Sequence, residues 1–223
     1  MHSYSFRMKS KRFMMERRYF IFHFPCNFLK KNSISTYILC GGKSSRMGRE
    51  KGLVKFKGKS FLSRILDEIP INASPVFLIT DKEIYQEFGR TLIPDLSPDK
   101  GPVGGVYTAL CHSDTEWVMI LSCDIPLIRR ELLNKLISKS RNSKADVVFF
   151  SDGENDFPLI ACYRKSLAIH FEKAVIEDKL KLKKLVDSLD TLQIQASSSE
   201  VIYLSNVNTP SDLEVLNKNQ LDS

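Results

Sequence analysis

A glycine-rich, basic stretch between positions 39 and 51 has the composition of an anion-binding loop. Gly41 and Gly42 allow the backbone to approach a ligand closely, and successive free N–H groups in such a loop attract anions. Arg46 and Lys51 add positive charges that can neutralise phosphate groups. The spacing is neither that of a P-loop nor that of the GxGxxG fingerprint. These residues therefore predict a phosphate site of another kind, with a flexible basic turn as the alternative.

Asp124 stands just after a strongly apolar run at residues 117–122. An acidic side chain at the end of a buried strand can reach a ligand at that edge of the sheet. Opposite a phosphate loop, its carboxylate can hold Mg²⁺, a hard cation that prefers carboxylate and phosphate oxygens. The alternative is that Asp124 caps the helix expected over residues 129–140, because Asp is a common cap residue.

Two other segments combine turn residues with polar side chains. Residues 94–106 are rich in proline and glycine and contain Asp95. A rigid loop that leads into a helix N-terminus can hold a base or an anion. Asn206 and Asn208 follow the last expected strand, residues 201–204. For this pair a ligand-binding role and ordinary turn chemistry with a helix cap both stay open.

The elements that must position these residues follow from the hydrophobic pattern. Short apolar runs alternate with helical patterns along the body of the chain. The alternation predicts an α/β fold, in which a single three-layer domain has a mostly parallel central sheet with helices on both faces. Ligands of such sheets bind at the carboxyl ends of the strands, which the candidate residues follow. Strands are expected over residues 35–39, 53–56, 76–80, 91–94, 117–122, 146–150, 158–163 and 201–204. Helices are expected over residues 60–69, 82–88, 106–111, 129–140, 166–178, 181–189 and 211–217.

The composition is that of an ordinary globular protein. The chain has 223 residues, of which 43% are hydrophobic and 26% charged, and these fractions argue against wholesale disorder and against a coiled coil. No run approaches the roughly 18 apolar residues of a membrane-spanning helix. The five cysteines lack CxxC spacing, so reduced thiols and a cytoplasmic location are expected.

The net charge of +7 is located in the first 33 residues, which hold eight Lys and Arg residues and one acidic residue. The remaining chain carries equal numbers of basic and acidic groups, so no specific nucleic-acid partner is expected. Residues 1–33 are expected to form a basic, poorly ordered extension, and residues 34–223 the domain. A secretory signal, a membrane-binding or nucleic-acid-binding arm, and translated sequence upstream of the true start are the alternatives for the extension.

Five motifs taken together resemble the MobA family of molybdenum cofactor guanylyltransferases: ILCGGKSSRMGREKGL, GPVGGVYTAL, SCDIPLI, DFPLIACY and NVNTPSDL. Their order and spacing match along residues 36–216, and the first has the LxGGxSxRMGxxK form of nucleotidyltransferases with a Rossmann-like fold. The resemblance implies an enzyme that transfers GMP from GTP to the terminal phosphate of molybdopterin. The products would be the guanine dinucleotide cofactor and pyrophosphate, and Mg²⁺ would be the cofactor.

The resemblance also implies roles for individual residues. It places GTP binding on Leu39, Cys40, Gly41, Gly42, Lys51, Asp95 and Asp124. Asp124 would also bind the metal, and Arg46, Lys51 and Asp124 are the expected catalytic residues. Asn206 and Asn208 would lie on the molybdopterin side. GTP and molybdopterin are the implied partners, and a protein that delivers molybdopterin stays open.

Two positions depart from the family pattern, and a third position, which follows it, bears on the choice of base. Cys40 stands where the family usually has alanine, and a small thiol should fit there. No asparagine follows the strand at residues 76–80, so a base contact falls to Thr80 or to the backbone. Gly41 follows the guanine branch, because the cytidylyltransferase relatives carry alanine in its place, and a missing methyl leaves room for a purine.

Three other functions stay open. One is a cytidylyltransferase of the same fold, and a second is a nucleotidyltransferase that acts on another phosphorylated acceptor. The third is a non-catalytic binding module that docks through its basic arm, although the neutrality of residues 34–223 argues against it.

Overall fold

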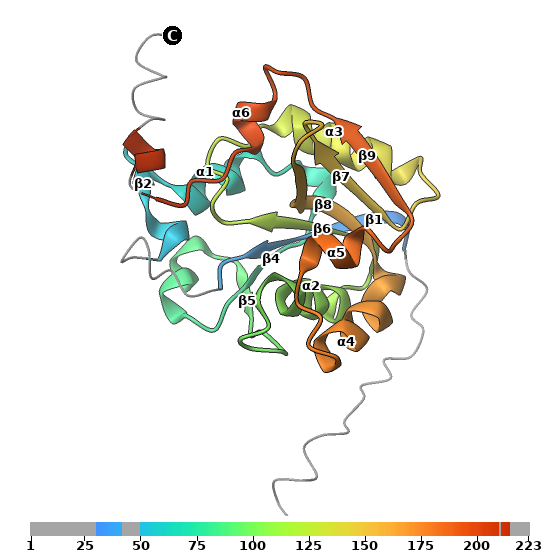
Figure 1. The fold of residues 1–223 in the computed structure, drawn as a ribbon. Coiled ribbons are helices and arrows are strands. Elements are labelled where there is room, and N and C mark those ends of the chain that lie inside the picture. The colour runs from blue at the N-terminus through green and yellow to red at the C-terminus, as the bar shows by residue number, and fades with distance from the viewer. Residues whose placement is uncertain (1–29, 42–49, 210, 215–223) are drawn as a thin grey trace, which may run out of the picture.

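The computed structural model describes residues 30–41, 50–209 and 211–214 (Figure 1). A single sheet of seven strands runs through the middle of the molecule. Its strands are β1 (Lys30–Leu39), β4 (Val76–Ile79), β5 (Thr91–Ile93), β6 (Thr115–Ser122), β7 (Val147–Ser151), β8 (Asp156–Arg164) and β9 (Thr191–Gln195). Their order across the sheet is β5-β4-β1-β6-β8-β7-β9. A separate two-stranded hairpin is formed by β2 (Lys55–Phe56) and β3 (Lys59–Ser60).

The sheet is mostly parallel, as predicted. Strands β5, β4, β1 and β6 are parallel neighbours, and β7 and β9 are parallel to each other. Only β8 runs the other way, between β6 and β7. Leu39 is in register with Ile79 on one side and with Ser122 on the other. The carboxyl ends of β1, β4 and β6 therefore meet at one edge of the sheet, where ligands of such folds bind.

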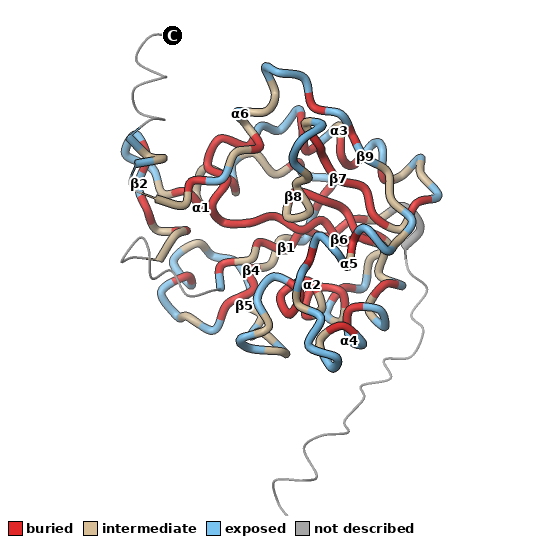
Figure 2. Tube along the Cα trace, viewed as in Figure 1, coloured by how far each residue is buried: buried red, intermediate tan, exposed pale blue. Residues whose placement is uncertain are grey.

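Helices cover both faces of the sheet and complete the three layers (Figure 1). One apolar cluster joins the sheet to α1 (Phe61–Glu68) and α3 (Arg130–Arg141). The other joins it to α2 (Gly101–His112), α4 (Ala168–Ile176) and α5 (Leu182–Val186). Figure 2 shows that burial is concentrated in the strands, and the β6 residues 118–121 have no exposed surface. Burial on both faces explains why this strand reads as an unbroken apolar run.

Near the end of the chain one expected element is wrong and one strand of the structure is not among those expected. Residues 201–204 form the short helix α6 (Val201–Leu204) rather than a strand, and the edge strand β9 was not predicted. The carboxylate of Glu200 accepts a hydrogen bond from the Ser197 N–H at 2.8 Å, and the Ser197 carbonyl accepts from the N–H of Glu200 at 2.9 Å. This reciprocal turn starts a helix in spite of the strand propensity of a Val-Ile-Tyr-Leu sequence.

Several element boundaries also differ from the expected ones. β1 begins at Lys30, so the last four residues of the predicted extension belong to the sheet, whereas residues 1–29 lie outside the described residues. The strand expected over residues 53–56 is a 3₁₀ turn, Lys51–Leu53, followed by β2. The helix expected over residues 82–88 is a 3₁₀ helix, Glu83–Phe88. Helix α2 starts five residues before its expected position, at Gly101.

Two helices near the end of the chain are shorter than expected. The expected helix 181–189 is limited to α5, and the one expected over 166–178 divides into a 3₁₀ turn, Lys165–Leu167, and α4. Residues 211–214 are helical, and the rest of that expected helix lies outside the described residues. None of the helices in the described part of the chain combines the length and apolarity that crossing a membrane requires.

Candidate functional site

The ends of β1 and β6 are joined directly at the ligand-binding edge of the sheet. The Cys40 N–H donates a hydrogen bond to the carbonyl of Ile79 at 3.1 Å, and the Cys123 N–H donates to the carbonyl of Leu39 at 3.3 Å. These bonds extend the sheet by one residue beyond each strand. The segment that begins at Gly41 and the carboxylate of Asp124 therefore start from neighbouring points of a rigid frame.

Three side chains from distant parts of the chain converge beside this frame. The Lys51 ammonium donates a hydrogen bond to Asp124 Oδ2 at 3.1 Å and to Asn208 Oδ1 at 2.5 Å. The side chain of Asp124 is 9% exposed and that of Lys51 26% exposed. Lys51 opens the 3₁₀ turn after the glycine-rich segment, Asp124 follows β6, and Asn208 follows α6. The three residues are named here the Lys51–Asp124–Asn208 cluster.

Asp124 is held by its backbone and keeps one carboxylate oxygen free. Its carbonyl accepts a hydrogen bond from the Val207 N–H at 2.8 Å. Among the described residues no partner reaches the buried Oδ1 atom. The residue that precedes α3 as its N-cap is Arg129, so the alternative that Asp124 caps this helix is excluded. A buried carboxylate oxygen without a partner is costly, and a ligand that supplies a cation or a donor would satisfy it.

The donor set of this cluster fits a hard cation that brings its own ligands. Within the described residues, no group of three or more His, Cys, Asp or Glu side chains is arranged to hold a metal ion. Asp124 offers one free carboxylate oxygen. Mg²⁺ is commonly held by one or two carboxylates, with substrate phosphates and water completing its shell. These residues therefore fit a magnesium ion whose other ligands are phosphate oxygens and water.

The two asparagines that the sequence grouped together are in different surroundings. Asn208 is half-buried in the cluster, whereas Asn206 is exposed. Asp212 anchors the segment, because its Oδ2 accepts hydrogen bonds from the N–H groups of Asn208 at 2.8 Å and Thr209 at 2.9 Å. These hydrogen bonds lower the pKa of Asp212. The expectation that both asparagines follow a strand is wrong, since α6 precedes them.

Asp95 is fixed after β5 by helix α2. Its Oδ1 accepts hydrogen bonds from the Ser97 N–H at 2.9 Å and from the hydroxyl of Thr108 at 2.8 Å. Thr108 is fully buried and also accepts from the Leu96 N–H at 2.9 Å. β5 is three strand spacings from β6, a separation of about 14 Å. Asp95 therefore follows a strand that is well separated from the strand that Asp124 follows.

Gly104 and Gly105 of α2 allow the loop after β5 and the strand β1 to lie close to the helix. A Cβ atom on Gly104 would lie 2.6 Å from the carbonyl oxygen of Ser97, a backbone atom that cannot move alone. A Cβ atom on Gly105 would lie 3.1 Å from the nearest methyl group of Leu39. The two glycines therefore tolerate a side chain to different degrees.

We expect Gly104→Ala to lower the free energy of unfolding by about 1–3 kcal/mol, because overpacking outweighs the gain in helix propensity. Gly105→Ala should stay within about 1 kcal/mol of the wild type, since the leucine methyl groups can shift and the helix gains an alanine. Denaturant unfolding of both variants measures the difference. Equal stabilities would contradict the close approach of the loop to α2.

The side chain of Cys40 lies in the core. It is 3% exposed and belongs to the same buried cluster as Cys123 and Tyr85. Contact with the Cys123 thiol, together with burial, raises the pKa of Cys40 well above its ordinary value. The thiol is therefore neutral at physiological pH and adds no negative charge beside a phosphate. The sulfur is accommodated where the family usually carries a methyl group.

The far end of the glycine-rich segment is anchored by residues that the sequence did not single out. Glu50 accepts a hydrogen bond from the Lys82 ammonium at 2.6 Å and one from the Tyr85 hydroxyl at 3.4 Å. Gly52 packs against the Tyr85 ring, where a Cβ atom would come within 2.9 Å of the ring carbon Cε1. Gly42, a predicted GTP-binding residue, and Arg46, a predicted catalytic residue, lie outside the described residues.

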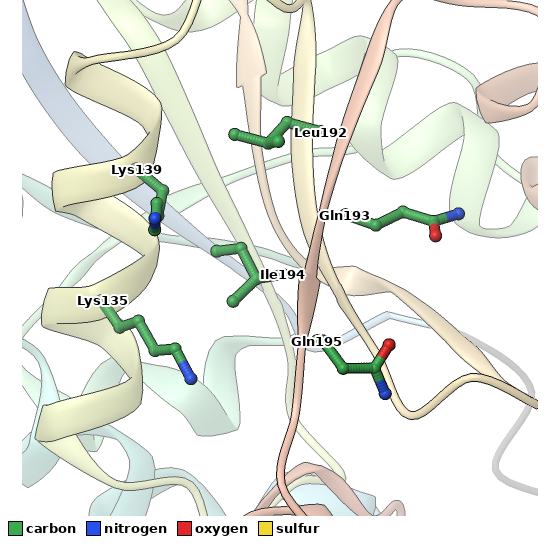
Figure 3. A pocket seen from close by; sticks show the side chains of 6 residues that line it. All are labelled: Lys135, Lys139, Leu192, Gln193, Ile194 and Gln195. Atoms are coloured by element: carbon green, nitrogen blue, oxygen red, sulfur yellow. The ribbon is translucent and has the colours of Figure 1, made fainter.

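A hollow of about 220 Å³ is found away from the cluster, between α3 and the edge strand β9 (Figure 3). It is lined by Lys135, Lys139, Leu192, Gln193, Ile194 and Gln195. Leu192 and Ile194 point toward the helix, and the two glutamines point away from it. The ammonium of Lys135 is already held by Glu200 at 3.1 Å. None of the residues predicted to bind ligand lines this hollow.

Comparison of the sequence with known proteins identifies close relatives. Residues 36–192 match the family model described as the MobA-like NTP transferase domain. A probable molybdenum cofactor guanylyltransferase of Flavobacterium johnsoniae is 43% identical over 187 residues, which cover 84% of this chain and 98% of that protein. A molybdenum cofactor guanylyltransferase of Yersinia pseudotuberculosis is 29% identical over 187 residues, which cover 82% of this chain and 94% of that protein.

Solved structures of other proteins share the same fold. Molybdopterin-guanine dinucleotide biosynthesis protein A from Archaeoglobus fulgidus gives a TM-score of 0.73 at 22% identity and covers 85% of this chain and 100% of its own. CMP:2-keto-3-deoxy-manno-octonic acid synthetase, complexed with CTP, gives a TM-score of 0.66 at 16% identity and covers 85% of this chain and 99% of its own. The expected fold class is confirmed.

Proposed function

Because this chain belongs to the MobA-like NTP transferase family, we propose that it transfers the GMP unit of GTP to the terminal phosphate of molybdopterin and releases pyrophosphate. The family resemblance predicted from the motifs is confirmed, and the chain is an enzyme of the nucleotidyltransferase type. The named relatives that it matches over almost their whole length are guanylyltransferases of the molybdenum cofactor.

One observation carries the proposal: a cation, a carboxylate and an amide meet at the carboxyl edge of the sheet. The Lys51 ammonium lies 3.1 Å from Asp124 Oδ2, and the other oxygen of this carboxylate is buried without a described partner. A nucleoside triphosphate bound here would place anionic phosphate next to Lys51 and a bound cation next to Asp124. Asp124 would hold Mg²⁺, which when bound neutralises phosphate charge and withdraws electrons from the α-phosphorus.

The reaction needs no activated side-chain nucleophile. The terminal phosphate monoester of molybdopterin is already anionic near neutral pH, since the second pKa of such a group is about 6. One of its oxygens attacks the α-phosphorus in line, a new P–O bond forms, and the bond to pyrophosphate breaks. The protein holds the two reactants in this geometry and stabilises the charge that moves onto pyrophosphate. Lys51 and Arg46, the other basic residue predicted to act in catalysis, supply that stabilisation, together with the N–H groups of the glycine-rich segment.

Space beside Gly41 supports guanine as the base. Among the described residues, a Cβ atom on Gly41 would have only the Ile79 carbonyl oxygen within 4 Å, at 3.8 Å. The fold itself would therefore accept alanine at this position, and the absence of a methyl group leaves room for a ligand. A purine fills this room better than a pyrimidine. Asp95, fixed by Thr108, is the proposed contact on the base or ribose side.

The cellular setting belongs to the same proposal. The four described cysteines are free thiols, which suits the reducing cytoplasm where GTP is supplied. Molybdopterin reaches the site as a substrate, and a protein that delivers it directly is a proposed partner.

Pyrophosphate release tests the proposal. Purified protein is incubated with Mg²⁺, molybdopterin and either GTP or CTP. We expect release with GTP, and its loss in Asp124→Ala. Release with CTP alone would overturn the base assignment and leave the reaction type intact. Absence of release with both nucleotides would show that the acceptor has been assigned wrongly or that the site is inactive.

A further inference from the structure

Asn208 lies against Lys51, the lysine predicted to bind phosphate, although the family resemblance implies a place on the molybdopterin side. Its Oδ1 atom accepts a hydrogen bond from the Lys51 ammonium at 2.5 Å, shorter than the 3.1 Å between that ammonium and Asp124. No hydrogen bond to another described side chain is found for this amide oxygen. The amide oxygen is therefore hydrogen-bonded to the lysine before the acceptor substrate binds.

The backbone that carries Asn208 is tied to the same cluster. The preceding residue, Val207, is 1% exposed and donates its N–H to the Asp124 carbonyl at 2.8 Å. The N–H of Asn208 itself donates to Asp212 at 2.8 Å. Fixed on both sides, the amide group does not depend on a flexible chain for its position. Lys51, by contrast, has a long side chain with several rotatable bonds, and holding it in one geometry costs conformational entropy.

The chemistry of an amide suits this task better than that of a second carboxylate. Lys51 has one charged acceptor in Asp124 and one neutral acceptor in Asn208. An amide oxygen orients the ammonium without cancelling its charge. Asp124 is also the proposed metal ligand. Asn208 is therefore the hydrogen-bond acceptor that orients Lys51 and leaves its positive charge available to a phosphate group.

We propose that Asn208 is a positioning residue for Lys51, which holds the ammonium where it contacts the phosphates of the bound nucleoside triphosphate. The inference rests on the proposed function and deepens it. The C-terminal segment thereby becomes part of the nucleotide site, although 157 positions separate the two side chains.

Binding of Mg·GTP in the absence of molybdopterin tests this role, because no acceptor contact contributes to it. Asn208→Ala should weaken GTP binding about tenfold, the effect of losing one hydrogen bond to a charged group. Asn208→Asp has the same shape but adds a negative charge, so it should weaken binding at least as much. Ser205→Ala, in the same segment, removes a hydroxyl that donates to the Val201 carbonyl at 3.1 Å and should leave GTP affinity unchanged.

A double-mutant cycle with Lys51→Met separates positioning from a direct contact. If Asn208 acts through Lys51, Asn208→Ala should cause no further loss of GTP affinity once the lysine is gone. Additive losses would overturn the inference, because Asn208 would then contact the nucleotide by itself. Unchanged GTP affinity in both Asn208 variants, with a raised KM for molybdopterin, would also overturn it and restore the molybdopterin-side role.

The same measurements distinguish failure of the inference from failure of the proposed function. If Lys51→Met binds GTP as tightly as the wild type, the proposed phosphate site is wrong and the inference fails with it. If Lys51→Met weakens binding and the Asn208 variants do not, only the inference fails. Thermal unfolding of each variant confirms that the folded protein is being compared.

Discussion

Asp124→Asn is expected to lower the kcat/KM of nucleotidyl transfer by about 10²–10³-fold, the range found when one preorganised charge stabiliser is removed. The substitution changes the shape of the side chain little but removes the charge that would hold the metal. The loss should be smaller at high Mg²⁺ concentration, because part of it is weakened metal binding. Steady-state kinetics over a range of Mg²⁺ concentrations measures both effects.

The stability of Asp124→Asn provides the control for this experiment. The carboxylate is 9% exposed, and its Oδ1 atom is buried without a described partner. An amide is cheaper to bury than a charge, and its oxygen can still accept the hydrogen bond from Lys51, so the variant should unfold at the same temperature as the wild type or a higher one. Turnover close to that of the wild type in this folded variant would remove Asp124 from the catalytic residues.

Lys51→Met is expected to lower kcat/KM by about 10²-fold or more, since it removes the positive charge next to the proposed phosphates. Methionine preserves the aliphatic length of the side chain, so the effect reports mainly on the ammonium. In contrast to Asp124→Asn, this variant should be less stable than the wild type by about 1–3 kcal/mol. The reason is that it leaves the Asp124 carboxylate and the Asn208 amide without their common partner.

The opposite stability effects of the two substitutions are a signature of the cluster. Denaturant unfolding without nucleotide measures the stability of each variant, and kinetics with GTP measures its activity. A Lys51→Met variant that is as stable as the wild type and loses little activity would show that the Lys51–Asp124–Asn208 cluster plays no part in the function.

Some elements can be predicted from the sequence because all their side chains are in the same kind of surroundings. Residues 117–121 of β6 are apolar without alternation, as expected for a strand covered by helices on both faces. The edge strand β9 gives no clear signal in the sequence, because it is short and carries exposed glutamines at positions 193 and 195. For residues 201–204 the propensity favours a strand, whereas the hydrogen bonds between Ser197 and Glu200 decide the outcome.

The candidate site was predictable as a set of residue types but not as a set of contacts. Lys51 and Asp124 stand out in the sequence because a cation after a glycine-rich segment and a carboxylate after an apolar strand both suggest phosphate chemistry. The contact between Lys51 and Asn208 depends on how the C-terminal segment returns to β6, and local sequence does not encode that path. The same is true of Lys82 and Tyr85, which meet Glu50 through the fold.

In the proposed reaction the α-phosphate of GTP is transferred to the acceptor as GMP. GTP labelled at the α-phosphorus, and separately at the γ-phosphorus, is incubated with the enzyme, Mg²⁺ and molybdopterin, and the products are separated. The proposed reaction predicts that the α label appears in the molybdopterin product and the γ label in pyrophosphate. A γ label on the acceptor, or an α label found only in free GMP or GDP, would contradict nucleotidyl transfer.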